Sequence, residues 1–169
     1  VTLNHATLPA TDKKALDLFC KKVGELSRVI QSANQYRDEL VTRLRYMKQA
    51  ALDAPAQSTA ISTSIRGLEV RLNTVNRLLN GDASLARREF ETAPSISSRL
   101  FYITGALWNT TAAPTNTQIS SYEIAASEFT PVYNEIKAIS VEIKKLEDML
   151  EKNGAPYTPG RLPEWKGNK

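Results

Sequence analysis

Apolar residues recur every three or four positions from Thr11 to about Asp53. This spacing places them on one face of a helix, because residues three and four apart are neighbours on a helix surface. The positions are Leu16, Phe19, Val23, Leu26, Ile30, Ala33, Arg37, Leu40, Leu44, Met47 and Ala51. Only Arg37 is not apolar. The pattern predicts a helix of roughly 60 Å at 1.5 Å per residue, whose apolar face must be covered by other helices or by a second copy.

Two shorter helices follow from the same spacing. The first begins at Ser58 or Thr59 and ends at Gly81-Asp82, a helix-stop signal. Its inward residues are Ile61, Ile65, Leu68, Leu72, Val75 and Leu79. A charged, turn-rich stretch separates it from the second, which runs from Ser95 to about Trp108. The inward residues of that helix are Ile96, Leu100, Ile103 and Leu107.

A last long helix begins at Thr115 or Thr117 and ends at Asn153-Gly154. Its expected inward residues are Ile119, Tyr122, Ala126, Phe129, Tyr133, Ile136, Ile139, Ile143, Leu146 and Leu150. The rhythm slips once after Tyr133, which shifts the apolar face around the helix. Because proline lacks an amide hydrogen, Pro131 predicts a kink over residues 127–131.

These elements predict an all-α fold: an elongated antiparallel bundle of four helices, two long and two short. We expect residues 1–10 to be extended and 11–153 to form the bundle, with Thr11 as the N-cap of the first helix. Residues 154–169 are rich in proline and glycine, and we expect them to form a tail packed on the bundle. Leu162 and Trp165 are its expected anchors.

The charge distribution changes this picture little. Hydrophobic residues make up 41% and charged residues 24% of the chain, with a net charge of +4. A nucleic-acid partner is not expected, because it would require a one-sided basic stripe. Six arginines would have to share one face to form it: Arg66, Arg71, Arg77, Arg87, Arg88 and Arg99. No apolar run reaches the roughly 18 residues of a membrane span, so none is expected.

Candidate catalytic groups are few. His5 is the only histidine, and it has no recognisable catalytic partner. Cys20 is the only cysteine, and because it adjoins Phe19 it is expected to be a small buried or half-buried hydrophobic residue rather than a nucleophile. The acidic pairs Glu123/Glu128 and Asp38/Glu39 fall off the apolar faces and lack an accompanying Glu-x-x-His motif. We therefore predict a protein that is not an enzyme, with no catalytic residue, no metal and no cofactor.

Arg37 interrupts the longest apolar face, so its guanidinium must find acceptors or reach solvent. One interpretation is a polar layer that fixes the register of the helices, formed with Asn34 and the second-helix residues Asn73, Asn76 and Asn80. The other interpretation is a ligand or interface site.

Aromatic residues at helix spacing or in the tail are expected in the core. They include Tyr102, Trp108, Tyr122, Tyr133, Tyr157 and Trp165. Any of them that is exposed would mark a docking patch. Trp108, Tyr157 and Trp165 are the candidate docking aromatics.

Three stretches carry a family resemblance: residues 71–82, residues 94–115, and the tail from Gly154-Ala155-Pro156-Tyr157 to Pro163. Their order and spacing resemble the helical region that follows the β-propeller in bacterial sortilin-like, BNR-repeat proteins, often labelled glycosyl-hydrolase-like. The resemblance implies a C-terminal accessory domain of a larger exported protein, periplasmic or at the cell surface. The absence of an initiator methionine fits a processed chain or a domain of a longer protein. None of the matched positions belongs to a known catalytic set of the family.

The sequence thus predicts a non-catalytic helical accessory domain that mediates protein packing, with a β-propeller or another protein as its neighbour. The alternative is a stand-alone coiled-coil-like adaptor or homodimerisation module. An exposed stripe at Leu18, Val29, Tyr36 and Val41 would favour that alternative. The sequence leaves the oligomeric state open.

Overall fold

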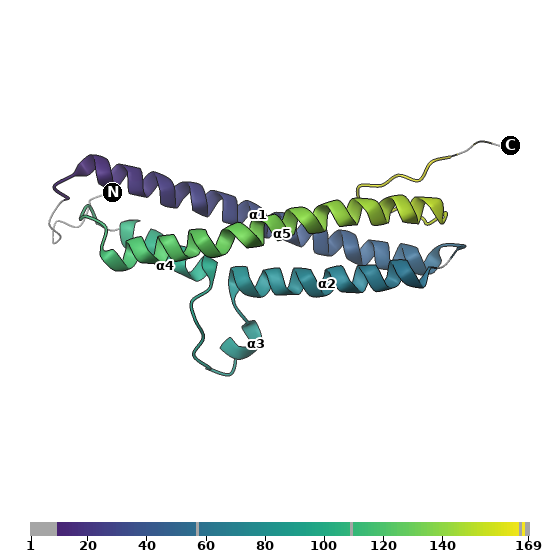
Figure 1. Cartoon of the computed structure of the whole chain (residues 1–169), viewed down its shortest axis with the longest axis horizontal. Helices are drawn as coiled ribbons and strands as arrows, with labels where there is room; N and C mark the ends of the chain where they lie inside the picture. Colours follow the sequence, from purple (N-terminus) through teal and green to yellow (C-terminus); the bar gives the residue numbers. More distant parts are fainter. Residues whose placement is uncertain (1–9, 57, 109, 166, 168–169) are drawn as a thin grey trace. The chain divides into compact units, whose positions relative to one another are not determined.

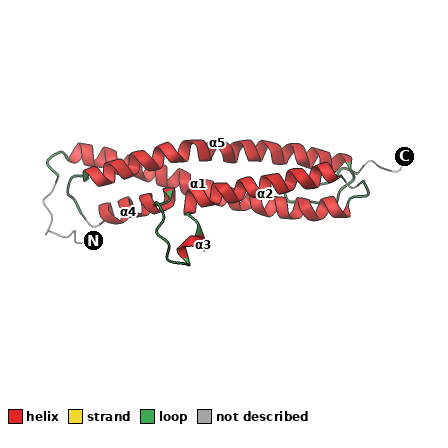
Figure 2. Cartoon of the chain, turned by 60° about the horizontal axis from the view of Figure 1, so that its bottom comes forward, coloured by secondary structure: helices red, strands yellow, loops and turns green. Residues whose placement is uncertain are grey.

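A computed structural model describes residues 10–56, 58–108, 110–165 and 167. Their helices are α1 Lys13–Asp53, α2 Thr59–Asn80, α3 Ala83–Ala86, α4 Ile96–Trp108 and α5 Asn116–Lys152. These described ranges contain no strand, only an isolated β-bridge between Thr158 and Arg161 (Figure 2). The predicted all-α class is confirmed. All four predicted helices are present, and the charged stretch after α2 adds the four-residue helix α3.

The chain forms two compact units, and three helices contribute to both. The first unit comprises residues up to Asn34 together with Asn76–Tyr133. The second comprises Gln35–Val75 and Asn134–Lys169. The boundaries therefore fall inside α1, α2 and α5, whereas α3 and α4 belong wholly to the first unit (Figure 1).

Side-chain caps set the start of the helices. Asp12 Oδ1 accepts hydrogen bonds from the amides of Lys14 and Ala15, at 3.0 and 2.9 Å. Asp12 thus caps α1, and the prediction of Thr11 is wrong. At α5 the amide of Thr115 donates to Gln118 Oε1 at 2.8 Å, while the amide of Gln118 donates to Thr115 Oγ1 at 3.3 Å. This reciprocal pair is a capping box, so Thr115 is the cap of α5.

Most of the residues that the spacing predicts to face inward on α1 and α2 are buried. Every predicted inward residue of α2 is buried. On α1 the buried members are Val23, Ile30, Ala33, Leu40, Leu44, Met47 and Ala51. Leu16, Phe19 and Leu26 are half-buried, and Phe19 makes an edge-on contact with Tyr122 at 5.9 Å between ring centroids. The three-four spacing therefore gives the covered side of both helices correctly. Cys20, next to Phe19, is exposed, so the expectation that it is buried or half-buried is wrong.

The inward face of α5 differs from the prediction in its first half. Its covered positions run Gln118, Tyr122, Ala125, Phe129, Val132, Ile136, Ile139, Ile143, Leu146 and Leu150, an unbroken alternation of four and three. The predicted slip after Tyr133 is wrong, because Val132 is buried and Tyr133 is exposed. Helix α5 continues through Pro131, which is exposed. The kink there stays a prediction.

Most of the predicted extended segment, residues 1–9 with His5, lies outside the described residues. Ala10 is buried, and its amide donates to the carbonyl of Thr111 at 2.8 Å.

Candidate interaction surfaces

Helix α4 has one covered side and one aromatic side. Three of its four predicted inward residues, Ile96, Leu100 and Ile103, are buried, and the fourth, Leu107, is half-buried. Phe101 and Trp108 are 81% and 77% exposed, and they lie seven residues apart, two turns along the same side of the helix. Tyr102 flanks them and is about half exposed. We call the exposed residues Phe101, Tyr102, Gly105 and Trp108 the α4 face.

The α4 face carries no charge. The one charged residue of α4, Arg99, is mostly buried and pairs with Glu128 on α5 at 4.0 Å. Gly105 lies between the two most exposed aromatics of this face, and a Cβ built there would have no described atom within 4 Å beyond its own neighbours in the helix. Glycine inside a helix costs about 1 kcal/mol relative to alanine. The packing within this chain therefore gives no reason for a glycine at this position, and its small size leaves room for another backbone to approach.

Trp108 and Tyr102 thus contradict the expectation that the helical aromatics are core, and they meet the condition for a docking patch. Phe101 is the residue that sequence reasoning missed. The signal was present, because the inward positions Ile96, Leu100 and Ile103 place Phe101 on the opposite side of the helix.

A cluster of amides joins three helices of the first unit. Asn80 Nδ2 donates to Asn34 Oδ1 at 2.8 Å and to Asn76 Oδ1 at 2.9 Å. The Ser97 hydroxyl of α4 donates to Asn80 Oδ1 at 3.1 Å. The structure thus brings together three of the predicted polar residues and adds Ser97. Each bond has a specific geometry, so the cluster ties α4 to one register on α1 and α2.

The other two members of the predicted polar layer lie in the second unit. Arg37 is mostly buried and forms an ion pair with Asp38 at 2.9 Å. Its Nε is buried without a hydrogen-bond partner among the described residues. Asn73 is exposed on α2. Arg37 and Asn73 are therefore outside the amide cluster, and a register or interface role for them stays a prediction.

Two ion pairs lie in the part of the second unit where the tail meets α1 and α5. Arg43 on α1 pairs with Glu147 on α5 at 2.5 Å, with only 12% and 11% of the two side chains exposed. Arg161 pairs with Glu151 on α5 and donates to the carbonyls of Ala155, at 3.0 Å, and Pro156. We call the Arg161–Glu151 pair, with the two carbonyl contacts of Arg161, the tail clamp.

The turn at Thr158–Arg161 completes the attachment of the tail. Gly160 has a φ of +90° and lies against the Arg43 guanidinium, which a Cβ would approach to 3.5 Å. Thr158 and Ala155 are buried, whereas Leu162 and Trp165 are 84% and 88% exposed. The expectation that Leu162 and Trp165 anchor the tail is therefore wrong: charges and small residues do so. Tyr157 and Trp165 remain available as docking aromatics.

Many ionisable groups are occupied by intrachain pairs. Arg71 on α2 donates to Glu135 at 2.6 Å and to Glu142 at 2.7 Å, and these hydrogen bonds raise the pKa of the guanidinium. Of the acids considered for catalysis, Asp38 pairs with Arg37 and Glu128 with Arg99. Among the described residues, no group of three or more His, Cys, Asp or Glu side chains is placed to hold a metal ion.

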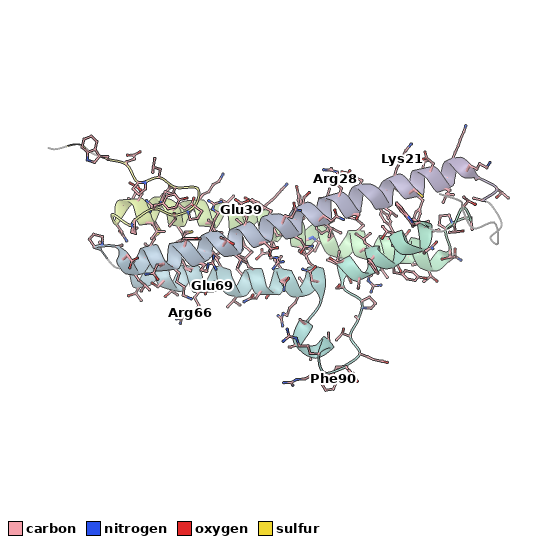
Figure 3. All side chains as sticks on the ribbon, turned by 180° about the vertical axis from the view of Figure 1, so that it is seen from behind. Lys21, Arg28, Glu39, Arg66, Glu69 and Phe90 are labelled. Atoms are coloured by element: carbon pink, nitrogen blue, oxygen red, sulfur yellow. The ribbon has the colours of Figure 1, made fainter. Side chains whose placement is uncertain are left out.

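Two basic residues of α1 pair with acids one turn away on the same helix. Lys21 pairs with Asp17 at 2.7 Å and Arg28 with Glu25 at 2.6 Å, on the exposed side of the helix (Figure 3). The hydrogen bond from Arg28 lowers the pKa of Glu25. The six arginines required for a nucleic-acid stripe are divided between the two units, and Arg71 and Arg99 among them are paired with carboxylates.

Within the described residues, every helix is too short or too polar to cross a membrane.

Comparisons with known proteins matched no protein-family model, no curated protein and no solved structure. The resemblance to the helical region of sortilin-like, BNR-repeat proteins therefore stays a prediction.

Proposed function

We propose that this chain is a non-catalytic helical accessory module that packs against a neighbouring protein domain, with the α4 face as its docking surface. The observation that supports the proposal is the exposure of Phe101 and Trp108 on an uncharged side of a short helix. Large aromatics cost free energy when they are left in water, and exposed apolar patches are typical of interaction sites. Tryptophan and tyrosine are also enriched among the residues that dominate binding energies.

The amide cluster supports the same proposal, because it would present the α4 face in a fixed position. Ser97 is one turn from Phe101 and bonds to Asn80, which bonds in turn to α1. A surface held in this way loses little conformational entropy on binding. The cluster is therefore proposed to position the docking helix.

The neighbour that the resemblance favours is a β-propeller in the same polypeptide, exported to the periplasm or the cell surface. In that arrangement ligand binding would belong to the propeller, and this module would stabilise it. Tyr157 and Trp165 in the tail are proposed as secondary contacts, since both are exposed and the tail clamp holds the segment that carries them.

The alternative, self-association through α1, has partial support. Leu18 and Val41 are exposed, as that alternative requires. Val29 is half-buried, and Tyr36 is half-buried in a 2.5 Å hydrogen bond with Ser140. Two of the four residues of the required stripe, Val29 and Tyr36, are thus partly covered by other residues of the same chain.

The test is sedimentation equilibrium and thermal unfolding of this chain, alone and joined to the protein sequence that its gene encodes upstream of Val1. We expect a folded monomer whose melting temperature rises in the longer protein. Phe101→Ser/Trp108→Ser should remove that rise, whereas the control Val70→Ser, at an exposed position of α2 in the second unit, should not. A tight dimer with the same melting temperature in both proteins would contradict the proposal and favour self-association.

A further inference from the structure

The connection between α2 and α4 is an exposed arm, which we define as residues 83–94. All of these residues are exposed, and α3 within it has no buried residue. Figure 1 shows the arm leaving the end of α2 and returning to the start of α4, and Figure 3 shows Phe90 near its tip. The arm therefore adds nothing to the core of the first unit.

Local hydrogen bonds give the arm its shape. Asp82 Oδ1 accepts from the amide and the hydroxyl of Ser84, at 2.9 and 2.6 Å. At the other end, the amides of Phe90 and Glu89 donate to the carbonyls of Leu85 and Ala86, at 3.3 and 3.2 Å, the bond pair of a Schellman motif. Among the described residues, the hydrogen bonds of the arm join residues at most five positions apart. Opening it thus exposes only groups that water can satisfy, and leaves the buried residues in place.

A pair of arginines, Arg87 and Arg88, lies inside this arm. An endoprotease binds its substrate as an extended, accessible strand, so exposed loops are the preferred sites of cleavage. The other adjacent basic pairs of the chain are Lys13-Lys14, Lys21-Lys22 and Lys144-Lys145. Lys21-Lys22 and Lys144-Lys145 lie well inside the long helices α1 and α5, where a protease must first unwind packed structure, whereas Lys13-Lys14 begins α1.

We propose that Arg87-Arg88 is a proteolytic processing site for endoproteases that recognise paired basic residues, and that the cleaved protein remains a folded complex of two chains. In the reaction, water adds across the peptide bond between Arg88 and Glu89. The bond from the Arg88 carbonyl carbon to the Glu89 nitrogen breaks, Arg88 gains a carboxylate, and Glu89 gains a protonated amino terminus. The protease supplies the catalytic groups, and this chain is the substrate.

The complex should survive because both units are built from both sides of the cut. The first unit combines residues up to Asn34 with residues beyond the cut, up to Tyr133, and the second combines Gln35–Val75 with Asn134–Lys169. The pairs Arg43–Glu147 and Arg71–Glu135 also join the two fragments. With Cys20 as the only cysteine, no disulfide links the fragments, so a denaturing gel separates them.

The test is limited digestion of the 169-residue chain with trypsin and, separately, with an endoprotease specific for paired basic residues. Mass spectrometry identifies the first internal cut, and size exclusion with light scattering follows the products. We expect fragments 1–88 and 89–169 that co-elute at the mass of the intact chain and keep its helical circular dichroism.

Two variants separate accessibility from recognition. Arg87→Gln should abolish cleavage by the paired-basic protease while trypsin still cuts after Arg88, and Arg87→Gln/Arg88→Gln should abolish both cuts. Both positions are exposed, so the helical signal should not change. A first internal cut at Lys21-Lys22 or Lys144-Lys145, or fragments that separate and lose helicity, would overturn the proposal.

Discussion

Replacing Phe101 and Trp108, the two most exposed aromatics of the α4 face, should leave the isolated chain nearly as stable as before. Phe101 and Trp108 are 81% and 77% exposed, so Phe101→Ser/Trp108→Ser removes little buried apolar area. Exposed substitutions of this kind usually change the free energy of unfolding by no more than about 0.5 kcal/mol each. Ile103 on the same helix is the matched control, because it is fully buried. Ile103→Ala should cost about 2–5 kcal/mol.

The same double substitution should have a large effect once a partner covers the α4 face. An aromatic side chain buries about 150–250 Å², so each residue offers more than about 100 Å² of apolar area, worth several kcal/mol at about 25 cal/mol per Å². Because association costs offset part of this, we expect a loss of about 2 kcal/mol or more for each residue, the range of binding hot spots.

Urea unfolding followed by far-ultraviolet circular dichroism measures the first effect, with the slope against urea as a check on two-state behaviour. A loss above about 2 kcal/mol for Phe101→Ser/Trp108→Ser in the isolated chain, where exposed sites are expected to lose far less, would refute the reasoning. It would mean that α4 already packs these side chains within the chain.

Three further outcomes follow from the structure. Arg43→Met should destabilise the chain by about 3–5 kcal/mol in urea unfolding, because Glu147 is left buried without its partner. The double substitution Arg43→Met/Glu147→Leu should recover most of that loss, because no charge is then left buried. Equal losses in the two variants would contradict a buried ion pair. Glu89 has a φ of +57°, a backbone conformation that glycine adopts more readily than other residues. Glu89→Gly should therefore relieve strain, stabilise the arm and slow its amide hydrogen exchange, whereas faster exchange would contradict strain at Glu89. Hydrogen bonds from Ser84 lower the pKa of Asp82. The cap that the Asp82 carboxylate forms is therefore complete above the ordinary aspartate pKa, and it is lost as the pH falls through the lowered pKa of Asp82. An NMR titration of the Ser84 amide should follow that loss, and a midpoint above about 4, the ordinary range for aspartate, would contradict it.

The fold could be read from the sequence wherever apolar spacing alone decides burial. Every predicted inward residue of α2 is buried, because large aliphatic side chains repeat there without a competing polar choice. Apolar spacing misplaces the inward face in the first half of α5, where the predicted Ile119 is exposed and the polar Gln118 is buried, with its side-chain oxygen accepting from the Thr115 amide. The burial of Gln118 depends on the geometry of the helix cap, which apolar spacing does not reveal.

The candidate site was only partly predictable. The asparagines were found because amides on facing helices can bond, but Ser97 required knowledge of where α4 lies. Leu162 and Trp165 were misassigned because hydrophobicity suggested burial, whereas the tail is held by Arg161 through an ion pair and backbone carbonyls. Such polar attachment depends on the three-dimensional position of Glu151, ten residues earlier in the chain.

The most direct test of the proposed docking role is the accessibility of Trp108 to a soluble quencher. Trp165→Phe leaves Trp108 as the only tryptophan of these 169 residues. Iodide quenching of the part of the fluorescence that Trp108→Phe removes is then compared between this chain and the full product of its gene. We expect strong quenching in the isolated chain at every concentration and protection in the full product. Equal quenching in both proteins would contradict docking through the α4 face, and protection of the isolated chain that grows with its concentration would show self-association instead.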